Sequence, residues 1–234
     1  MYYGFIYNCS KMIGMSQQIA NGTNRIYKKG APILYQGEVP REGYRLVQGV
    51  VKAYIYDEES EELIVAFVKS GEYFPIQWLL NSTKSSIYYF EALSDCKVYA
   101  FSRQDFETSM NESDELKQHL FDRLAREYNN VLLRVSAMGQ SKARDKILYT
   151  MYYMLEQFGK SKDGERYAID LKITHGMIAS LTGLARETIA SELGELRQSG
   201  VIDYKSRDYS INKPALIKCI GEGNFIDLVS RNGD

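Results

Sequence analysis

Apolar and polar positions follow two different periods along this chain. Between residues 24 and 101, short apolar runs are separated by turns that contain glycine. Regularly spaced short strands of this kind predict an all-β sandwich or barrel. The turn glycines are expected to hold positive φ, which only glycine adopts without steric cost; they are Gly30, Gly37, Gly49 and Gly71. We expect strands at residues 33–35, 44–47, 50–56, 63–68, 87–93 and 97–101.

The apolar period changes from residue 114 onward. Neither proline nor glycine interrupts residues 114–138, which predicts one helix of about 37 Å. Six apolar side chains recur there at alternating spacings of three and four, as in a coiled coil: Phe121, Leu124, Tyr128, Val131, Val135 and Met138. Such a seam packs either on the helix's own domain or on a second copy of the chain. We favour a homodimer, because a long helix between two domains has little else to bury its stripe.

The C-terminal part predicts two short helices followed by a hairpin. Thr174 is suited to cap the first helix, Gly183 permits a tight turn, and Gly200 is suited to end the second. Helix, tight turn, helix and hairpin in this order form a winged helix-turn-helix. We expect helices at residues 141–158, capped by Ser141, 175–181 and 186–198, a polar turn at 159–165, and strands at 167–171, 201–204 and 209–211.

The second short helix begins with Arg186-Glu187. In a major groove, arginine donates two hydrogen bonds to guanine and glutamate accepts one from cytosine N4. A solvated charge pair in a first helical turn is the alternative interpretation, and the surrounding turn, helix and hairpin favour DNA reading. The predicted DNA contacts are Arg186, Glu187, Thr188, Ser191, Thr174, Lys205, Arg207 and Lys172.

Four motifs lie in a fixed order along the chain: YRLVQGVVKAY at residues 44–54, SGE at 70–72, SRQDF at 102–106 and GLARETI at 183–189. In this order and spacing they resemble the CRP/FNR superfamily of cyclic-AMP-receptor-like transcription regulators. The resemblance implies an α+β protein with an N-terminal β-roll (a cyclic-nucleotide-binding-like jelly roll), a long dimerisation helix and a C-terminal winged helix-turn-helix. The implied domains are a β-roll sensor at 1–113, the dimerisation helix at 114–138, the DNA-binding domain at 139–220 and a tail at 221–234.

The DNA-reading helix departs from this family at two positions. Ala185 stands where a serine or threonine cap would be better, since alanine accepts no helix N–H bond and costs about 1 kcal/mol as a cap. Ser191 stands where many members have a second base-reading arginine. Its short side chain makes no bidentate contact, so we expect the half-site to differ there by about 1–3 kcal/mol of discrimination.

The sensor departs from the family more strongly. Members that bind cyclic nucleotides follow Gly-Glu with an Arg-Ser or Arg-Thr pair, because a cyclic phosphate needs a guanidinium and hydroxyl donors. Residues 81–87, NSTKSSI, contain no arginine. We therefore expect a small effector other than cyclic AMP, or none. The candidate pocket is Gly71, Glu72, Tyr73, Phe74, Lys84, Ser85, Ser86, Tyr88, Asn129 and Asn130, with core packing as the favoured alternative for most of its aromatic members.

Charge and cysteine content narrow the function classes. The chain has 29 Lys+Arg and 30 Asp+Glu, so affinity for DNA is expected to come from a dimer reading specific bases rather than from bulk attraction. Cys9, Cys96 and Cys219 are odd in number and far apart, which indicates no disulfide framework and no metal pair. We find no phosphate loop, no H-E-x-x-H and no G-x-S-x-G, and therefore predict no enzyme.

The sequence thus predicts a homodimeric transcription regulator on a palindromic DNA site, modulated by a small effector. Its predicted partners are double-stranded DNA, a second copy of itself and RNA polymerase. No signal peptide and no apolar run of about 20 residues was found, so we expect a cytoplasmic protein without a membrane partner. The alternative is a ligand-binding or protein-interaction module whose helix-turn-helix does not bind DNA. The effector, the target genes and the choice between activation and repression are not encoded in recognisable motifs.

Overall fold

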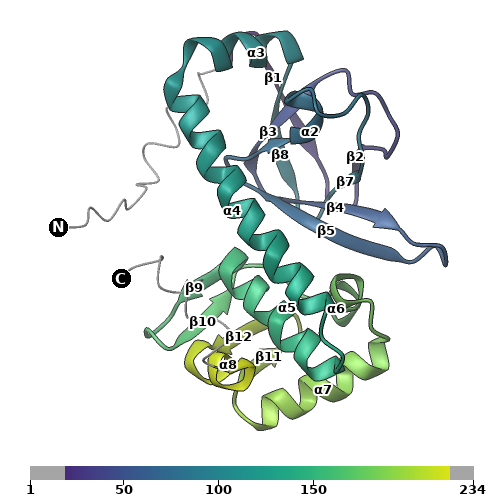
Figure 1. Ribbon diagram of the computed structural model, residues 1–234, viewed down its shortest axis with the longest axis vertical. Helices are drawn as coiled ribbons and strands as arrows, with labels where there is room; N and C mark the ends of the chain where they lie inside the picture. The colour runs from purple at the N-terminus through teal and green to yellow at the C-terminus, as the bar shows by residue number, and fades with distance from the viewer. Residues whose placement is uncertain (1–18, 222–234) are drawn as a thin grey trace. The chain divides into compact units, whose positions relative to one another are not determined.

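The computed structural model describes residues 19–221. The chain divides into two compact units between Arg123 and Leu124. This division falls inside α4 (Asp114–Met138), the long helix that the apolar seam predicts (Figure 1). Cys9 and the tail after residue 221 lie outside the described residues.

The N-terminal unit is built from two four-stranded sheets in which every described strand pair is antiparallel. Their strand orders are β1-β8-β3-β6 and β2-β7-β4-β5. The six predicted strands are confirmed, whereas β1 and β6 were not predicted. The strands are β1 (Thr23–Tyr27), β2 (Pro32–Leu34), β3 (Gly43–Gln48), β4 (Val50–Tyr56), β5 (Glu62–Lys69), β6 (Tyr73–Phe74), β7 (Tyr89–Ala92) and β8 (Cys96–Phe101).

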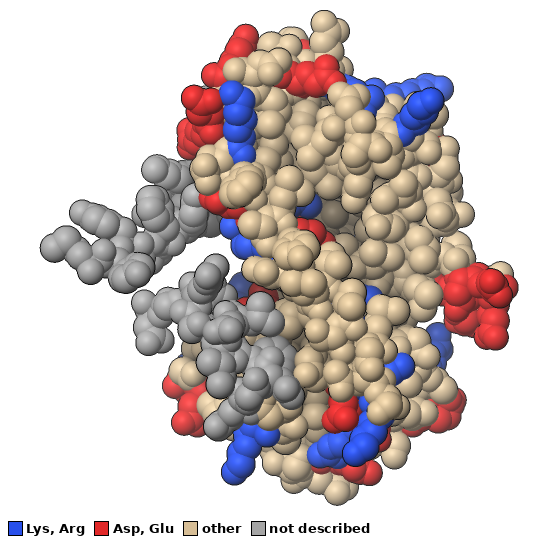
Figure 2. All heavy atoms as spheres, viewed as in Figure 1, with Lys and Arg blue, Asp and Glu red and all other residues tan. Residues whose placement is uncertain are grey.

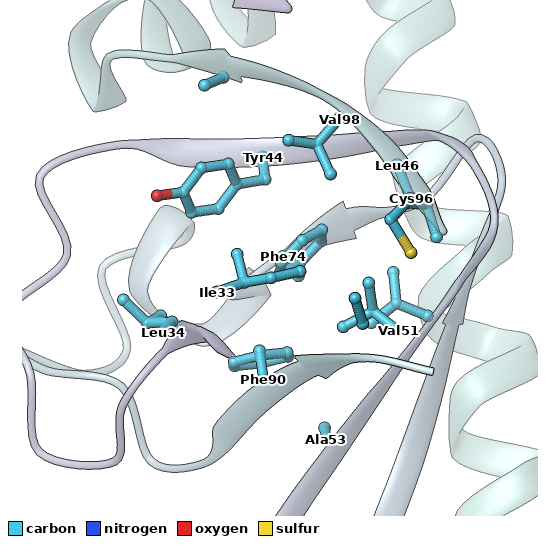
Figure 3. Close-up of a cluster of buried hydrophobic side chains, with 13 residues drawn as sticks. Ile33, Leu34, Tyr44, Leu46, Val51, Ala53, Phe74, Phe90, Cys96 and Val98 are labelled. Atoms are coloured by element: carbon cyan, nitrogen blue, oxygen red, sulfur yellow. The ribbon is translucent and has the colours of Figure 1, made fainter. Parts of the chain in front are cut away.

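The core of this unit lies between the two sheets (Figure 3). Phe74 is packed between Tyr44 and Phe90, with ring centroids 5.2 Å away on each side. All four turn glycines have positive φ, as predicted. At Gly49 a Cβ atom would also lie 2.5 Å from the Asp95 carbonyl oxygen, so only glycine fits there.

Helices are packed on the first of these sheets through a second apolar cluster. Tyr73 and Phe101 from the strands pack with Phe106, Leu116 and Leu120 from the helices. The helices are α2 (Ile76–Leu79), α3 (Arg103–Glu112) and the start of α4. Ser102 caps α3 by accepting from the Asp105 N–H at 3.0 Å, which confirms the helix entry predicted there.

The C-terminal unit contains the predicted winged helix-turn-helix. Its four-stranded sheet has the order β11-β12-β10-β9. The predicted helices are confirmed, and α8 was not predicted. The polar turn predicted at 159–165 is wrong in its first part, because residues 159–161 form strand β9, which pairs with β10. Ser141 is not the cap of α5, because that helix begins after Lys142, which makes no side-chain cap. The elements are α5 (Ala143–Phe158), β9 (Gly159–Ser161), β10 (Arg166–Ile169), α6 (His175–Thr182), α7 (Arg186–Gln198), β11 (Ile202–Lys205), β12 (Asp208–Asn212) and α8 (Lys213–Ile220).

Within residues 19–221, no helix is both long enough and apolar enough to cross a lipid bilayer. The same part of the chain holds no group of three or more His, Cys, Asp or Glu side chains placed to bind a metal ion.

Candidate nucleic-acid interface

Helices α6 and α7 are held at their crossing by buried aliphatic side chains. Ile178 on α6 and Ile189 and Leu193 on α7 are fully buried. Thr174 caps α6, because its Oγ1 accepts from the Met177 N–H at 3.0 Å. Gly183 ends α6 with a φ of +67°, in the left-handed region that glycine adopts freely. Both predicted roles are confirmed, and they set the direction in which α7 leaves the turn.

The first turn of α7 presents the predicted base-reading side chains to solvent. Arg186, Glu187 and Ser191 are exposed, and Thr188 is half-buried. The Arg186 guanidinium lies over the first turn of α6, where Gly176 presents only backbone; a Cβ at that position would be 3.6 Å from Arg186 Nη2. The Arg186 guanidinium therefore lies beside the first turn of α6, and its side chain is exposed.

An ion pair that the sequence analysis did not identify fixes the middle of α7. Arg144 on α5 places its Nη1 3.0 Å from Glu195 Oε2 and 3.9 Å from Glu192 Oε2. The residues are about 50 positions apart in the chain, so no local pattern could have paired them. Because both of its ion-pair partners are on α7, Arg144 connects α5 to α7.

The hairpin β11–β12 forms the wing next to these helices. Lys205 and Asp208 are opposite each other in the backbone register of the two strands, and Ser206 forms the turn between them with a φ of +59°. Lys172 forms an ion pair with Asp208, so its charge is compensated in the structure. In contrast, Arg186, Lys205 and Arg207 are exposed and form no ion pair within the described part of the chain.

Acidic and basic side chains are mixed on the visible face of the C-terminal unit (Figure 2). This face has no extended basic area. Within this unit, Arg197 is compensated by Asp203, with Nε 3.0 Å from Oδ1.

The apolar seam of α4 is exposed in the single chain. All six predicted seam residues, from Phe121 to Met138, are between 40 and 67% exposed. In contrast, Leu133 and Ala137 on the same helix are buried. Large apolar side chains thus form a continuous exposed row along this helix.

Arg134 joins the C-terminal half of α4 to the helix-turn-helix. Its Nη2 donates to the Leu181 carbonyl oxygen at 3.3 Å, near the end of α6. Its guanidinium also lies over the Tyr153 ring, 5.5 Å from the centroid. Burial lowers the pKa of this arginine. The helix that carries the seam is thus bonded to the helix that precedes α7.

The predicted effector residues are only partly brought together. Tyr73 and Phe74 are 1% exposed and belong to the two core clusters. Both side chains therefore pack in the core. Burial also raises the pKa of Tyr73. Ser86 is buried, and its hydroxyl donates to the Tyr88 carbonyl oxygen at 2.6 Å. The Tyr88 side chain packs against the core cluster that contains Phe74. Lys84 is exposed and Ser85 is half-buried.

Gly71-Glu72 forms the turn before β6, where the family signature places it. Glu72 Oε2 accepts from the Lys69 N–H at 2.8 Å and lies 3.7 Å from Arg123 Nη2. Arg123 Nη1 also donates to the Tyr73 carbonyl oxygen at 2.5 Å. The Glu72 carboxylate is therefore engaged by protein groups.

Asn129 and Asn130 lie in the C-terminal unit, where Asn130 donates to Glu127 Oε2 at 3.4 Å. Their contact with an effector stays a prediction.

Comparison with known protein families assigns both units. The Cyclic nucleotide-binding domain family matches residues 24–113, and the Crp-like helix-turn-helix domain family matches residues 147–219. The chain belongs to the CRP/FNR superfamily. As a CRP/FNR regulator it is a DNA-binding transcription regulator of α+β architecture, and the curated relatives it matches are regulators rather than enzymes.

Relatives of this CRP/FNR regulator match it over most of its length. The Global nitrogen regulator of Synechococcus elongatus is 23% identical over 216 residues, which cover 90% of this chain and 96% of that protein. The Cyclic AMP receptor protein of Thermus thermophilus is 26% identical over 200 residues, covering 85% and 88%. The structure of FixK2 from Bradyrhizobium japonicum has the same fold, with a TM-score of 0.71 at 21% identity, and covers 85% of this chain and 96% of that chain.

The uncapped start of α7 in this CRP/FNR regulator allows a stability prediction. Ala185 occupies the cap position with extended backbone and accepts no side-chain hydrogen bond. Ala185→Ser is expected to raise the free energy of unfolding by about 1 kcal/mol, because serine accepts an N–H of the first turn. Denaturant unfolding measures this change. Ala190→Ser is the matched control, since the same change in the exposed interior of α7 lowers stability by about 0.5 kcal/mol; equal effects at the two positions would contradict the capping argument.

Proposed function

We propose that this regulator binds a palindromic DNA site as a homodimer formed along α4, and that a small effector other than cyclic AMP shifts the dimer between two states. The observation that carries the proposal is the exposed apolar seam of α4 in a chain that also presents Arg186 without an ion-pair partner among the described residues. The seam provides a surface for a second copy of the chain, and Arg186 provides a side chain that can contact a base.

The seam supports a symmetric dimer. A two-fold axis brings the same apolar side chains of two copies together, and coiled-coil spacing keeps them in contact along the helix. Fully burying one such side chain is worth about 1.5–3 kcal/mol. Six half-exposed side chains from each copy therefore supply enough apolar surface for stable association.

Arg186 and Glu187 support recognition of one G·C pair in each half-site. Arginine matches guanine O6 and N7, and glutamate accepts from cytosine N4. Their position in the first turn of α7 is the part of a recognition helix that contacts base edges. Ser191, one turn further along, is too short to repeat the bidentate contact, so the second contact to the half-site is weaker.

Two arginines of α4 support a coupling between sensor and DNA-binding helices. Arg123 contacts Glu72 and the Tyr73 carbonyl oxygen within the N-terminal unit. Arg134 contacts the Leu181 carbonyl oxygen within the C-terminal unit. An effector acts on DNA binding only if its affinity differs between two dimer states. A ligand that competes for the Glu72 carboxylate would change one end of this connection.

Selection of random duplex DNA by the purified protein tests the proposal. We expect enrichment of an inverted repeat that contains one G·C pair per half at the position read by Arg186. Repeating the selection with a panel of metabolites is expected to reveal one that changes the affinity. Enrichment of sites without inverted symmetry would refute the dimer, and the absence of any enrichment would favour a module that does not bind DNA.

Cyclic AMP is expected to bind with a Kd above about 1 mM, or not at all. Residues 81–87 offer no guanidinium for a cyclic phosphate, and Arg123 already engages Glu72. Isothermal titration calorimetry measures this directly, with a relative named as a cyclic AMP receptor as the positive control. A micromolar Kd would contradict the prediction.

A regulator that acts at promoters is expected to contact RNA polymerase and to reside in the cytoplasm, where bacterial-type regulators of this family meet DNA. Retention of RNA polymerase on a promoter fragment, measured with and without the regulator, tests the first point. Unchanged retention at every selected site would refute it.

A further inference from the structure

The tip of the wing carries two cations that lack an ion-pair partner in residues 19–221. Lys205 ends β11, Ser206 makes the turn with positive φ, and Arg207 follows immediately before β12. Lys205 and Arg207 are exposed. The neighbouring cations are compensated, Lys172 by Asp208 and Arg197 by Asp203. Positive charge on the wing is therefore concentrated at its tip.

The backbone of this tip is tied to the helix-turn-helix. The Ile173 N–H donates to the Arg207 carbonyl oxygen at 3.0 Å, just before α6 begins. The Lys172–Asp208 ion pair connects the same two segments. The tip is thus anchored on the residues that position α6, so the Arg207 side chain starts from a fixed Cα position.

Aromatic stacking holds the base of the wing. Tyr204 stacks on Tyr209 with a centroid distance of 4.9 Å. The Arg197 guanidinium, from the end of α7, lies 4.9 Å from the Tyr204 ring centroid, and His175 of α6 meets the same ring edge-on at 6.2 Å. Both helices of the motif therefore brace the hairpin, and the wing is a rigid projection rather than a loose loop.

A single guanidinium on a narrow, rigid tip suits the minor groove. That groove is only about 6 Å wide, and it becomes narrower and more negative in A·T-rich tracts, which attracts arginine. Arginine also loses hydration more readily than lysine, so it enters a narrow groove more easily. Because the tip is already anchored, ordering it on DNA costs little conformational entropy.

We propose that Arg207 enters the minor groove beside each half-site and makes the regulator prefer A·T-rich flanking sequence. This inference rests on the proposed function as a DNA-binding dimer. Lys172 then positions the wing through Asp208 instead of contacting phosphate, and Lys205 contributes a phosphate contact without sequence preference.

The test uses the full chain and a palindrome taken from the selection described above, with its flanks changed from A·T tracts to G·C-rich sequence. The unchanged protein is expected to bind the A·T-flanked site about three- to tenfold more tightly. In Arg207→Ala this ratio is expected to fall to about one. Arg207→Lys retains the charge but is expected to recover less than half of the flank preference. Lys205→Ala, the matched control, is expected to weaken binding equally on both flanks.

The outcomes separate this inference from the proposed function. Equal affinity of the unchanged protein for both flanks, or an equal loss on both flanks in Arg207→Ala, would overturn it and leave only a phosphate contact. Failure to bind any palindrome would refute the proposed function itself. Arg207→Ala should keep the thermal unfolding curve of the unchanged chain, because only the backbone of Arg207 anchors the tip; binding ratios are then compared between folded proteins.

Discussion

Val135→Glu is expected to convert the proposed homodimer into a monomer and to weaken binding to the proposed palindrome at least about 100-fold. Val135 is 60% exposed in the single chain and lies in the middle of the C-terminal half of the seam. In a symmetric dimer the change removes two buried valines, each worth about 1.5 kcal/mol or more, and places two carboxylates at an apolar interface. Sedimentation equilibrium measures the dissociation constant, and fluorescence anisotropy measures DNA affinity.

Ser136→Glu is the matched control for this prediction. Ser136 is the next residue of α4 and is also exposed. It lies about 100° around the helix axis from Val135 and therefore outside the seam. Its substitution adds the same charge to the same helix and should leave the chain dimeric. If both variants stay dimeric, α4 is not the interface; if both dissociate, helix stability rather than the seam is responsible.

Arg186→Ala is expected to remove sequence-specific binding while leaving the weak binding to random DNA. A bidentate contact to guanine is worth about 1–3 kcal/mol, and a dimer loses two of them. Affinity for the palindrome should therefore fall by about 30-fold or more. Arg186 forms no ion pair within residues 19–221, so the fold is expected to remain intact. Competition between the palindrome and random duplex DNA measures the specificity ratio.

Two further variants separate base reading from loss of charge. Arg186→Lys keeps the positive charge but not the two-pronged donor geometry, and is expected to lose most of the specificity. Lys218→Ala removes an exposed charge from α8 and should keep the specificity ratio unchanged. A specificity ratio that is the same in Arg186→Lys and the unchanged protein would show that Arg186 contacts phosphate and does not read a base.

Elements with a strong period could be predicted from the sequence. The bounds of α7 and α4 agree with their apolar repeats because each helix has a clear start or stop signal in its flanking residues. Strand β6 has only two residues and α2 has four, so neither contains enough of a period to be recognised. Strand β1 was not predicted for another reason: nearly all of its residues are exposed, so its sequence shows no alternation of apolar and polar positions.

The candidate site was predictable in its residue types but not in its pairings. Arg186 and Thr174 follow from local helix signals. The ion pair of Lys172 with Asp208 joins residues 36 positions apart, and the placement of Tyr73 and Phe74 in the core depends on how two sheets pack. Tertiary contacts of this kind decide which charges remain open to DNA, and a single sequence does not encode them in any local pattern.

The exposed seam of α4 restricts how the length of this helix can change during evolution. Each inserted residue turns all following side chains by about 100° around the helix axis. An insertion between Tyr128 and Val131 would therefore separate the earlier seam residues from the later ones. Insertions or deletions of seven residues keep one continuous stripe. Length variants of this helix should accordingly be tolerated in steps of seven, and naturally occurring single-residue changes in length should be absent between Phe121 and Met138.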